Sequence, residues 1–316
     1  MTSDYEKNQK ARPELTVFTV NWFSVDFIEH LFLNLNEKAG APDRIEYLVV
    51  DNTHGGDKEI TRLMQTELPV KLCSYDAKGK TGSFAHALGL NFALSKVQTE
   101  YALVVDPDVY VFKDKWDCFS IDEIETKNCS AIGTTFPPWQ LGKYHNFPNP
   151  VFCLFRTKDF KMLNADWSPY SKNRCINLYN FVRRLVLRGG LLINRKRYQD
   201  CPIIRKVWTS LERAIGVCSP DTGWRIAKNA KQKHTGAILL EAVSPGDKVK
   251  GSGTTAFRDL AGEFELYYYR NEPILTHRYG TCSYVWRTPQ GANTEFWRTC
   301  IQSFQNEIAK DKGQPN

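Results

Sequence analysis

The chain of 316 residues lacks any apolar run close to the roughly 20 residues that a transmembrane helix needs. Positions 1–13 are polar and charged and lack the apolar centre of a secretory signal peptide. No two of the nine cysteines have the Cys-x-x-Cys spacing typical of a structural zinc site. An odd number of cysteines without a secretory leader indicates reduced thiols. We therefore expect a cytoplasmic protein, and neither a membrane-spanning chain nor a zinc module.

Two glycine-rich nucleotide-binding fingerprints are also absent. Positions 79–81 (Gly-Lys-Thr) look like the end of a P-loop, but Ser74 stands where that motif requires its first glycine. Gly251 and Gly253 lack both a third glycine and a preceding strand. The sequence thus argues against a P-loop and against a dinucleotide-binding fingerprint.

The sequence does contain enough apolar material for a large core, with 42% hydrophobic and 13% aromatic residues. In the first half, strand-like runs alternate with helix-like segments across short connections, which predicts an α/β fold with a mostly parallel sheet and helices on both faces. The second half is less regular. The expected strands cover 15–20, 45–50, 70–75, 101–105, 131–135, 151–155, 265–269 and 273–276, and the expected helices cover 26–39, 58–66, 82–97 and 221–230.

Two aspartates separated by one residue follow the apolar run 101–105. Asp106 and Asp108 lie at the end of what reads as a buried strand, where carboxylates are costly without a partner. Residues two apart on an extended chain point the same way, so both carboxylates can face one cation. Carboxylate oxygens suit hard divalent ions, which commonly bridge a diphosphate. The pair therefore indicates metal-assisted chemistry on a nucleotide diphosphate. The alternative is that Asp106 caps a loop and Asp108 is solvated.

Polar side chains also end the first two expected strands, at Asn21 and at Asp51-Asn52. The carboxyl ends of parallel strands meet at one edge of a sheet, where open α/β proteins bind their ligands. We therefore expect these residues to form one pocket with Asp106 and Asp108. Taken alone, Asp51-Asn52 could equally be an ordinary strand-to-loop cap.

Four segments carry a resemblance to a known family. Thr19–Trp22, Val49–Thr53, Gly82–Asn91 and Val105–Asp108 occur in the order and at the spacing of inverting nucleotide-sugar glycosyltransferases of family 2, which have the GT-A fold. The Asp-Pro-Asp element resembles in particular the rhamnosyltransferase-type members. The resemblance covers about residues 15–112 and weakens after Asp114.

The resemblance implies roles for the strand-end residues and a metal cofactor, Mn²⁺ or Mg²⁺. Asp51 would hydrogen-bond the nucleobase, while Asn21 and Asn52 would shape the nucleoside pocket. Asp106 would contact the ribose or the diphosphate–metal assembly. Asp108 would be the main protein ligand of the metal.

Three further candidates lie in the second half. Asp221, in a segment that resembles the family's acidic element at a helix start, is the expected general base, with helix N-cap as the alternative role and Asp166 as a weaker rival. Residues 276–281 resemble the family's late His-containing motif, which implies that His277 completes the metal shell and that Arg278 holds a phosphate, with a purely structural histidine as the alternative. His86, at the start of a helix, is a further residue that could face phosphate.

Residues 172–213 form a basic segment with 11 Lys and Arg side chains against two acidic ones. The segment has helical spacing, and three readings stay open. It could contact anionic lipid at the inner face of a membrane, bind an anionic acceptor such as a lipid-linked glycan, or be a core helix with a solvated basic edge. No nucleic acid partner is expected, because no RNA- or DNA-binding module is visible.

The resemblance predicts a metal-dependent glycosyltransferase of the hexosyltransferase type, active in polysaccharide biosynthesis. It would move a sugar from a nucleotide-diphosphate sugar to a hydroxyl of a glycan or glycolipid, with inversion. Two alternatives remain: a non-catalytic glycan- or membrane-binding module, and a sugar nucleotidyltransferase, whose glycine-rich signature is missing after the first strand. The expected division is a disordered tail at 1–14, a nucleotide-sugar-binding half at 15–115, an acceptor-binding and catalytic half of the same domain at 116–306, and a tail at 307–316.

Overall fold

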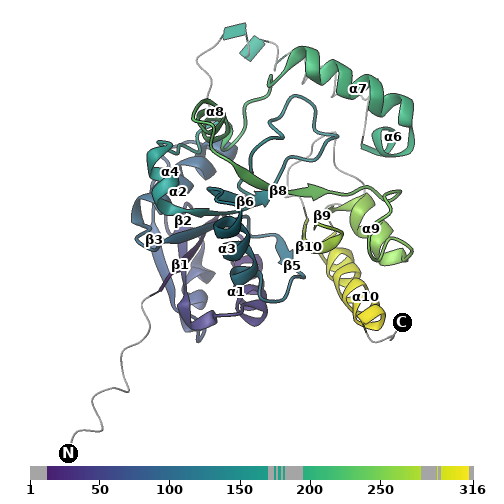
Figure 1. Ribbon diagram of the computed structural model, residues 1–316. Coiled ribbons are helices and arrows are strands. Elements are labelled where there is room, and N and C mark those ends of the chain that lie inside the picture. The colour runs from purple at the N-terminus through teal and green to yellow at the C-terminus, as the bar shows by residue number, and fades with distance from the viewer. Residues whose placement is uncertain are drawn as a thin grey trace, which may run out of the picture.

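The computed structural model describes residues 13–169, 195–278 and 293–312, with the isolated positions 174, 175, 177, 178, 181 and 290. Within them, ten strands form a sheet in the order β3-β2-β1-β4-β7-β6-β8-β9-β10-β5 (Figure 1). The strands are β1 (Leu15–Asn21), β2 (Ile45–Asp51), β3 (Val70–Ser74), β4 (Tyr101–Val105), β5 (Val109–Val111), β6 (Ala131–Thr134), β7 (Phe152–Arg156), β8 (Ala237–Ala242), β9 (Glu265–Tyr269) and β10 (Glu272–His277).

The expected α/β class with a mostly parallel sheet is confirmed. Strands β3, β2, β1 and β4 are parallel neighbours, and β6 is parallel to β8, whereas β7, β9 and β5 run against their neighbours. The helical elements are α1 (Val25–Lys38), η1 (Pro42–Arg44), η2 (Lys58–Gln65), α2 (Gly82–Lys96), α3 (Trp116–Thr126), α4 (Thr157–Met162), α6 (Arg195–Asp200), α7 (Pro202–Ile215), α8 (Trp224–Gln232), α9 (Thr255–Glu263) and α10 (Thr294–Lys312).

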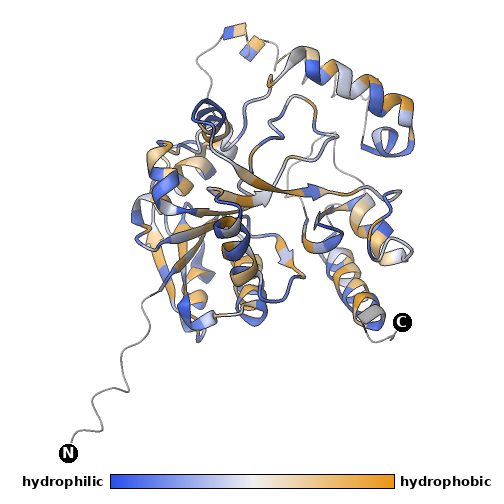
Figure 2. Cartoon of the chain, viewed as in Figure 1, coloured by the Kyte–Doolittle hydropathy of each residue, from blue (hydrophilic) through white to orange (hydrophobic). Residues whose placement is uncertain are grey.

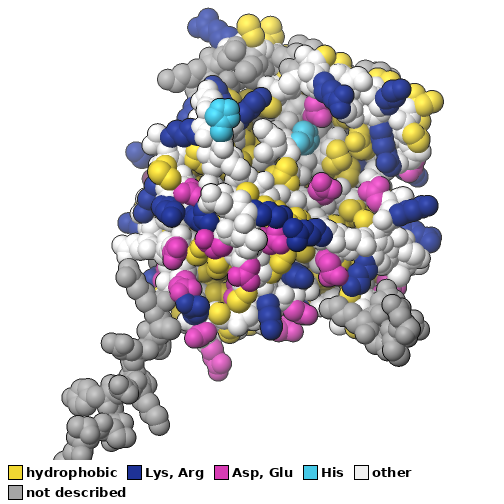
Figure 3. Space-filling view, viewed as in Figure 1, with side chains coloured by type: hydrophobic (Ala, Val, Ile, Leu, Met, Phe, Trp, Pro, Cys, Tyr) yellow, Lys and Arg dark blue, Asp and Glu magenta, His cyan; other side chains and the backbone are white. Residues whose placement is uncertain are grey.

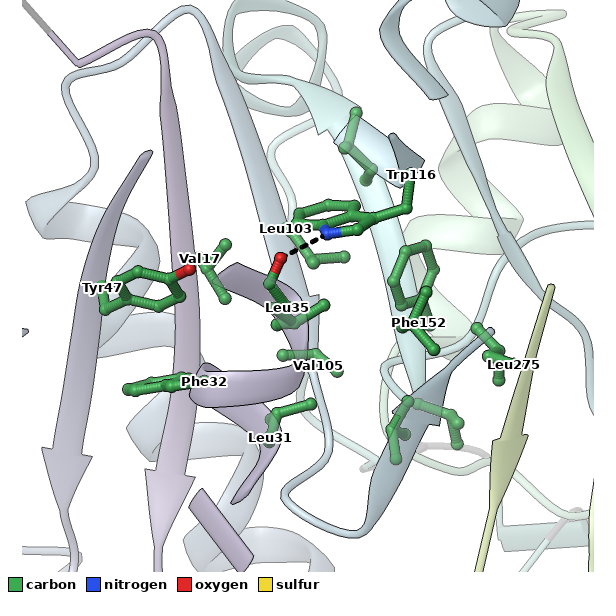
Figure 4. Packing of buried hydrophobic residues seen from close by; sticks show 14 of the residues in the cluster. Val17, Leu31, Phe32, Leu35, Tyr47, Leu103, Val105, Trp116, Phe152 and Leu275 are labelled. Carbon is green, nitrogen blue, oxygen red and sulfur yellow. Dashed lines mark hydrogen bonds between the residues drawn. The ribbon is translucent and has the colours of Figure 1, made fainter. Parts of the chain in front are cut away.

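Side chains of the parallel strands alternate between two hydrophobic cores, as the period of two in a strand requires. Val17, Tyr47 and Leu103 face the core formed with α1, α3 and η2, where the Trp116 indole donates a hydrogen bond to the Leu35 carbonyl at 2.8 Å (Figure 4). Their neighbours along each strand face the opposite core, formed with α2, α4 and α8. The strands in the middle of the sheet are accordingly hydrophobic along most of their length (Figure 2). Helices on both faces are therefore what these apolar strands need in order to be buried.

The C-terminal part adds a third core. Helices α9 and α10 pack on β9 through residues that include Leu260, Leu266 and Phe304. Helix α10 continues to Lys312, so it extends past position 306, where we expected the folded part to end. Within 58–66 the expected helix is the 3₁₀ helix η2, in which Glu59 and Arg62 form an ion pair at the i,i+3 spacing that this helix type aligns.

Only part of the basic segment 172–213 is described. Its C-terminal portion forms α6 and α7, whose buried side chains Tyr198 and Trp208 cluster with Trp139 and Leu141 from the loop after β6. The helical prediction for 182–194 lies outside the described residues. None of the described helices is both long enough and apolar enough to cross a membrane.

Candidate functional site

The first part of the site lies where β1 and β2 end side by side, with Asn21 paired to Asp51 in the strand register. The buried Asn21 amide donates to Asp51 at 3.2 Å and to Asp57 at 3.0 Å. Asp51 also accepts hydrogen bonds from the backbone and hydroxyl of Thr53, at 3.0 and 2.7 Å. The expected grouping of Asn21 with Asp51 is therefore present, as a rigid, hydrogen-bonded strand end.

Asn52 points to the other face of the sheet, toward α2. Its amide nitrogen donates to the Ala85 carbonyl at 2.8 Å, while its Oδ1 is buried without a hydrogen-bond partner among the described atoms. Gly89 of α2 gives it room, because a Cβ at that position would lie 2.9 Å from the Asn52 amide nitrogen. Asn52 thus ties the end of β2 to the first turns of α2.

Asp106 follows β4, next to the β1 end in the sheet order. Burial raises the pKa of the Asp106 carboxyl above its usual range, against the opposing effect of His86 and His277. Its Oδ1 has no hydrogen-bond partner among the described residues, and His86 Nε2 lies 3.5 Å from it. A buried carboxylate oxygen without a donor is costly, so a site for a positively charged group is the physical expectation here.

Asp108 lies next to His277 because the strands β5 and β10 pair with each other. The short strand β5 begins directly after Asp108 and lies antiparallel to β10, with Val109 opposite His277. His277 Nε2 lies 3.2 Å from Asp108 Oδ1 and 3.9 Å from Asp106 Oδ2. Residues some 170 positions apart in the sequence thus come together, as expected for the proposed metal ligands.

The environment of His277 is strongly acidic. Burial alone would lower the pKa of its imidazole, but the charges and hydrogen bonds of Asp108 and Glu265 raise it well above the usual range. Arg278 is also buried; its Nε lies 4.0 Å from Asp108, its guanidinium stacks over the Phe27 ring at 4.7 Å, and it donates to the Thr294 hydroxyl. The cluster therefore balances partly buried carboxylates against a buried imidazole and a buried guanidinium.

The donor set fits a hard divalent ion in its chemistry, since carboxylates and one imidazole suit Mn²⁺ or Mg²⁺. The unpartnered Asp106 oxygen also fits such an ion. As arranged, however, no group of three or more His, Cys, Asp or Glu side chains in the described parts of the chain could hold a metal ion. His277 Nε2 faces the Asp108 carboxylate, so these side chains pair with one another, and a cation bound by both residues would replace this contact.

Asp221 lies in the turn before α8. Its carboxylate forms an ion pair with Lys143 and accepts a hydrogen bond from the Thr222 backbone at 2.8 Å. The N-cap of α8 is Gly223, so the helix-cap role considered for Asp221 is wrong, and the helix begins at Trp224, later than expected. Its role as a base stays a prediction.

Asp166, the rival base, is held by several donors. Burial alone would raise its pKa, but hydrogen bonds from Ser168 and Asn91 and the ion pair with Arg225 lower it below the usual range. A carboxylate whose lone pairs are occupied in this way is a poor proton acceptor. The structure thus weakens the case for Asp166.

Two residues of the site were not anticipated from the sequence. Asp57 accepts from Asn21, and Glu265, the first residue of β9, accepts from His277. An acid that starts the apolar run Leu266–Tyr269 is a signal that could have drawn attention to Glu265, because a buried carboxylate needs a partner. The loop around Asp57 carries no such signal.

Comparison with known proteins finds a limited structural similarity and no sequence match. No family model matches the sequence, and neither does any curated protein. Among solved structures, the chain is similar to the mannosyltransferase PcManGT from Pyrobaculum calidifontis in complex with GDP-Man and Mn²⁺, with 20% identity, 48% of this chain and 47% of that chain covered, and a TM-score of 0.39. It is also similar to TarS from S. aureus (16% identity, 49% and 30% covered, TM-score 0.38) and to TarS 1–349 in complex with UDP-GlcNAc (18%, 49% and 48%, TM-score 0.37). The chain thus spans half or less of the length of these proteins, and TM-scores below 0.5 carry no weight for its function.

Proposed function

We propose that this protein is a metal-dependent glycosyltransferase that moves a sugar from a nucleotide-diphosphate sugar to a hydroxyl group of a glycan or lipid-linked glycan, with inversion. The observation that carries the proposal is the convergence of Asp106, Asp108 and His277 beside the strand ends that hold Asn21 and Asp51. The family resemblance of the four N-terminal motifs supports it independently.

In this proposal the strand ends bind the donor. Asn21 and Asp51 form the nucleoside pocket, and Asn52 supports the end of β2 from the other face of the sheet through its hydrogen bond to α2. Asp106, Asp108 and His277 would hold the divalent ion, Mn²⁺ or Mg²⁺, which would supply positive charge to the leaving diphosphate.

The acceptor hydroxyl needs a base, and Asp221 is our candidate. Its carboxylate is about a quarter exposed, so an acceptor hydroxyl can reach it. Lys143 holds it in one orientation. The proton of the hydroxyl moves to Asp221 as the oxygen attacks the anomeric carbon, the glycosidic bond forms, and the bond to the diphosphate breaks on the opposite face.

Substitution of the base tests this mechanism. Asp221→Asn keeps the shape of the side chain and removes the proton acceptor, so we expect kcat to fall about 10²–10⁴-fold with little change in donor KM. The assay is release of nucleoside diphosphate from a panel of nucleotide sugars with glycan and lipid-linked acceptors. Asp166→Asn serves as the matched control. Near-normal kcat in Asp221→Asn would show that another group is the base.

A specific observation also favours contact with a membrane surface. In α7, Ile203, Val207 and Leu211 are 74%, 58% and 43% exposed and recur every fourth residue, so they line one face of the helix. Trp208, about 100° round the helix from Val207, packs into the protein. Basic and apolar side chains lie next to each other on the edge of the molecule where α7 lies (Figure 3). We therefore propose that α7 lies on an anionic bilayer, as a peripheral contact at the inner face of a membrane.

A further inference from the structure

Glu265 is a buried acid next to the proposed metal ligands. Its side chain is only 2% exposed. One carboxylate oxygen accepts from the Gln140 amide at 3.1 Å, and the other accepts from the Tyr267 hydroxyl and pairs with His277 Nδ1, both at 2.9 Å. A carboxylate this deeply buried is tolerated because each oxygen has a donor.

The backbone fixes the position of His277 relative to this acid. Glu265 and His277 are opposite residues in the β9–β10 register, and His277 is in turn opposite Val109 of β5. On one side, the Thr276 hydroxyl donates to the Glu265 carbonyl at 2.9 Å; on the other, the Arg278 amide donates to the Asp108 carbonyl at 3.0 Å. The imidazole is therefore held between two acids by three hydrogen-bonded strands.

The two ring nitrogens have different partners as a result. Nδ1 lies 2.9 Å from the Glu265 carboxylate, and Nε2 is the nitrogen that faces Asp108 and Asp106. An imidazole that ligates a metal through one nitrogen commonly donates from the other to a carboxylate. Such a partner fixes the ring orientation and raises the basicity of the ligating nitrogen.

We propose that Glu265 is a positioning residue that directs His277 Nε2 toward Asp106 and Asp108 and thereby sets the affinity of this cluster for a divalent cation. The inference rests on the proposed function in one respect, that the cation is Mn²⁺ or Mg²⁺. It concerns binding of the ion alone, without donor or acceptor.

Manganese titration of the full chain, followed by electron paramagnetic resonance without nucleotide, tests the proposal. Glu265→Gln keeps the size of the side chain and removes its charge, so we expect it to fold and to bind Mn²⁺ about 10–100-fold more weakly. Tyr267→Phe is the matched control, because it removes one donor to Glu265 and leaves the contact with His277; we expect nearly unchanged affinity. Thermal unfolding of each variant without metal checks the fold.

A second readout separates positioning from general stability. The ¹⁵N resonances of the His277 ring report its protonation and hydrogen bonding, and we expect Glu265→Gln to change them while Tyr267→Phe does not. Manganese binding that needs Asp108 but is equal in wild-type protein and Glu265→Gln would overturn this inference and leave the proposed function intact. Absence of manganese binding by the wild-type protein, with or without nucleoside diphosphates, would overturn both.

Discussion

At the scale of single residues, Asp106 is held in a state that favours ligand binding over stability. Its side chain is about a fifth exposed, but the Oδ1 atom is buried and has no hydrogen-bond donor among the described residues. Burial without a donor opposes folding of the ionised form. Sites of this kind are retained where a bound group supplies the missing partner.

We therefore predict that Asp106→Asn stabilises the metal-free protein by about 1 kcal/mol, because the neutral amide has a smaller desolvation penalty. The same change should abolish the response of the protein to manganese. Urea unfolding of both proteins without metal measures the first effect, and the same experiment with manganese measures the second. A lower free energy of unfolding for metal-free Asp106→Asn would mean that His86 and His277 already compensate the charge.

A second residue-scale prediction concerns Gly89 in α2. Replacing a helical glycine by alanine normally stabilises a helix by about 1 kcal/mol. Here the new Cβ would lie 2.9 Å from both the Asn52 amide nitrogen and the Val20 side chain, so we expect a net loss of about 1–3 kcal/mol. Thermal unfolding measures this loss of stability. Gly253→Ala is the control, because no atom lies within 4 Å of the Cβ added there. Increased stability of Gly89→Ala would show that the Asn52 contact gives way easily.

At the scale of elements, the strands of the first half were predictable because they are buried on both faces. Their apolar runs are nearly continuous, and the structure has β1, β2 and β4 within one or two residues of the expected bounds. The start of α8 was misjudged because Ser-Pro-Asp before Thr222 resembles a helix N-terminus, whereas the chain makes a turn first, with Trp224 donating to the Asp221 carbonyl at 3.0 Å. Local sequence signals therefore predicted where a helix or strand lies better than the residue at which it begins or ends.

The exposed apolar face of helix α7 should determine how tightly the protein binds anionic vesicles. Burying one isoleucine side chain contributes about 1.5–3 kcal/mol, so Ile203→Glu should weaken binding to vesicles with anionic lipid by about tenfold or more. Met64→Glu is the matched control, because Met64 is 58% exposed and lies in η2, outside the basic segment. Co-sedimentation with neutral and anionic vesicles measures both. Equal binding of the two variants, or no preference for anionic lipid, would contradict the membrane role of α7.

At the scale of the whole molecule, the site combines a part that the sequence could predict with a part that it could not. Asn21, Asp51 and Asp106 end parallel neighbouring strands, so their proximity follows from topology alone. The approach of Glu265 to His277, and of His277 to Asp108, depends on antiparallel pairing of β9, β10 and β5 across long sequence separations. No local pattern encodes that register. The family resemblance pointed to His277, and only the fold pointed to Glu265.

The most direct test of the proposed function is a thermal-shift measurement with UDP, GDP, dTDP and CDP, each with and without manganese, on wild-type protein and Asp108→Ala. A ligand at 100 times its Kd stabilises the folded state by about 2.7 kcal/mol, which is readily detected. We predict a rise in Tm for one nucleotide, only with manganese, and its loss in Asp108→Ala. No rise for any nucleotide, or an equal rise in Asp108→Ala, would contradict a metal-dependent nucleotide-sugar site at this edge of the sheet.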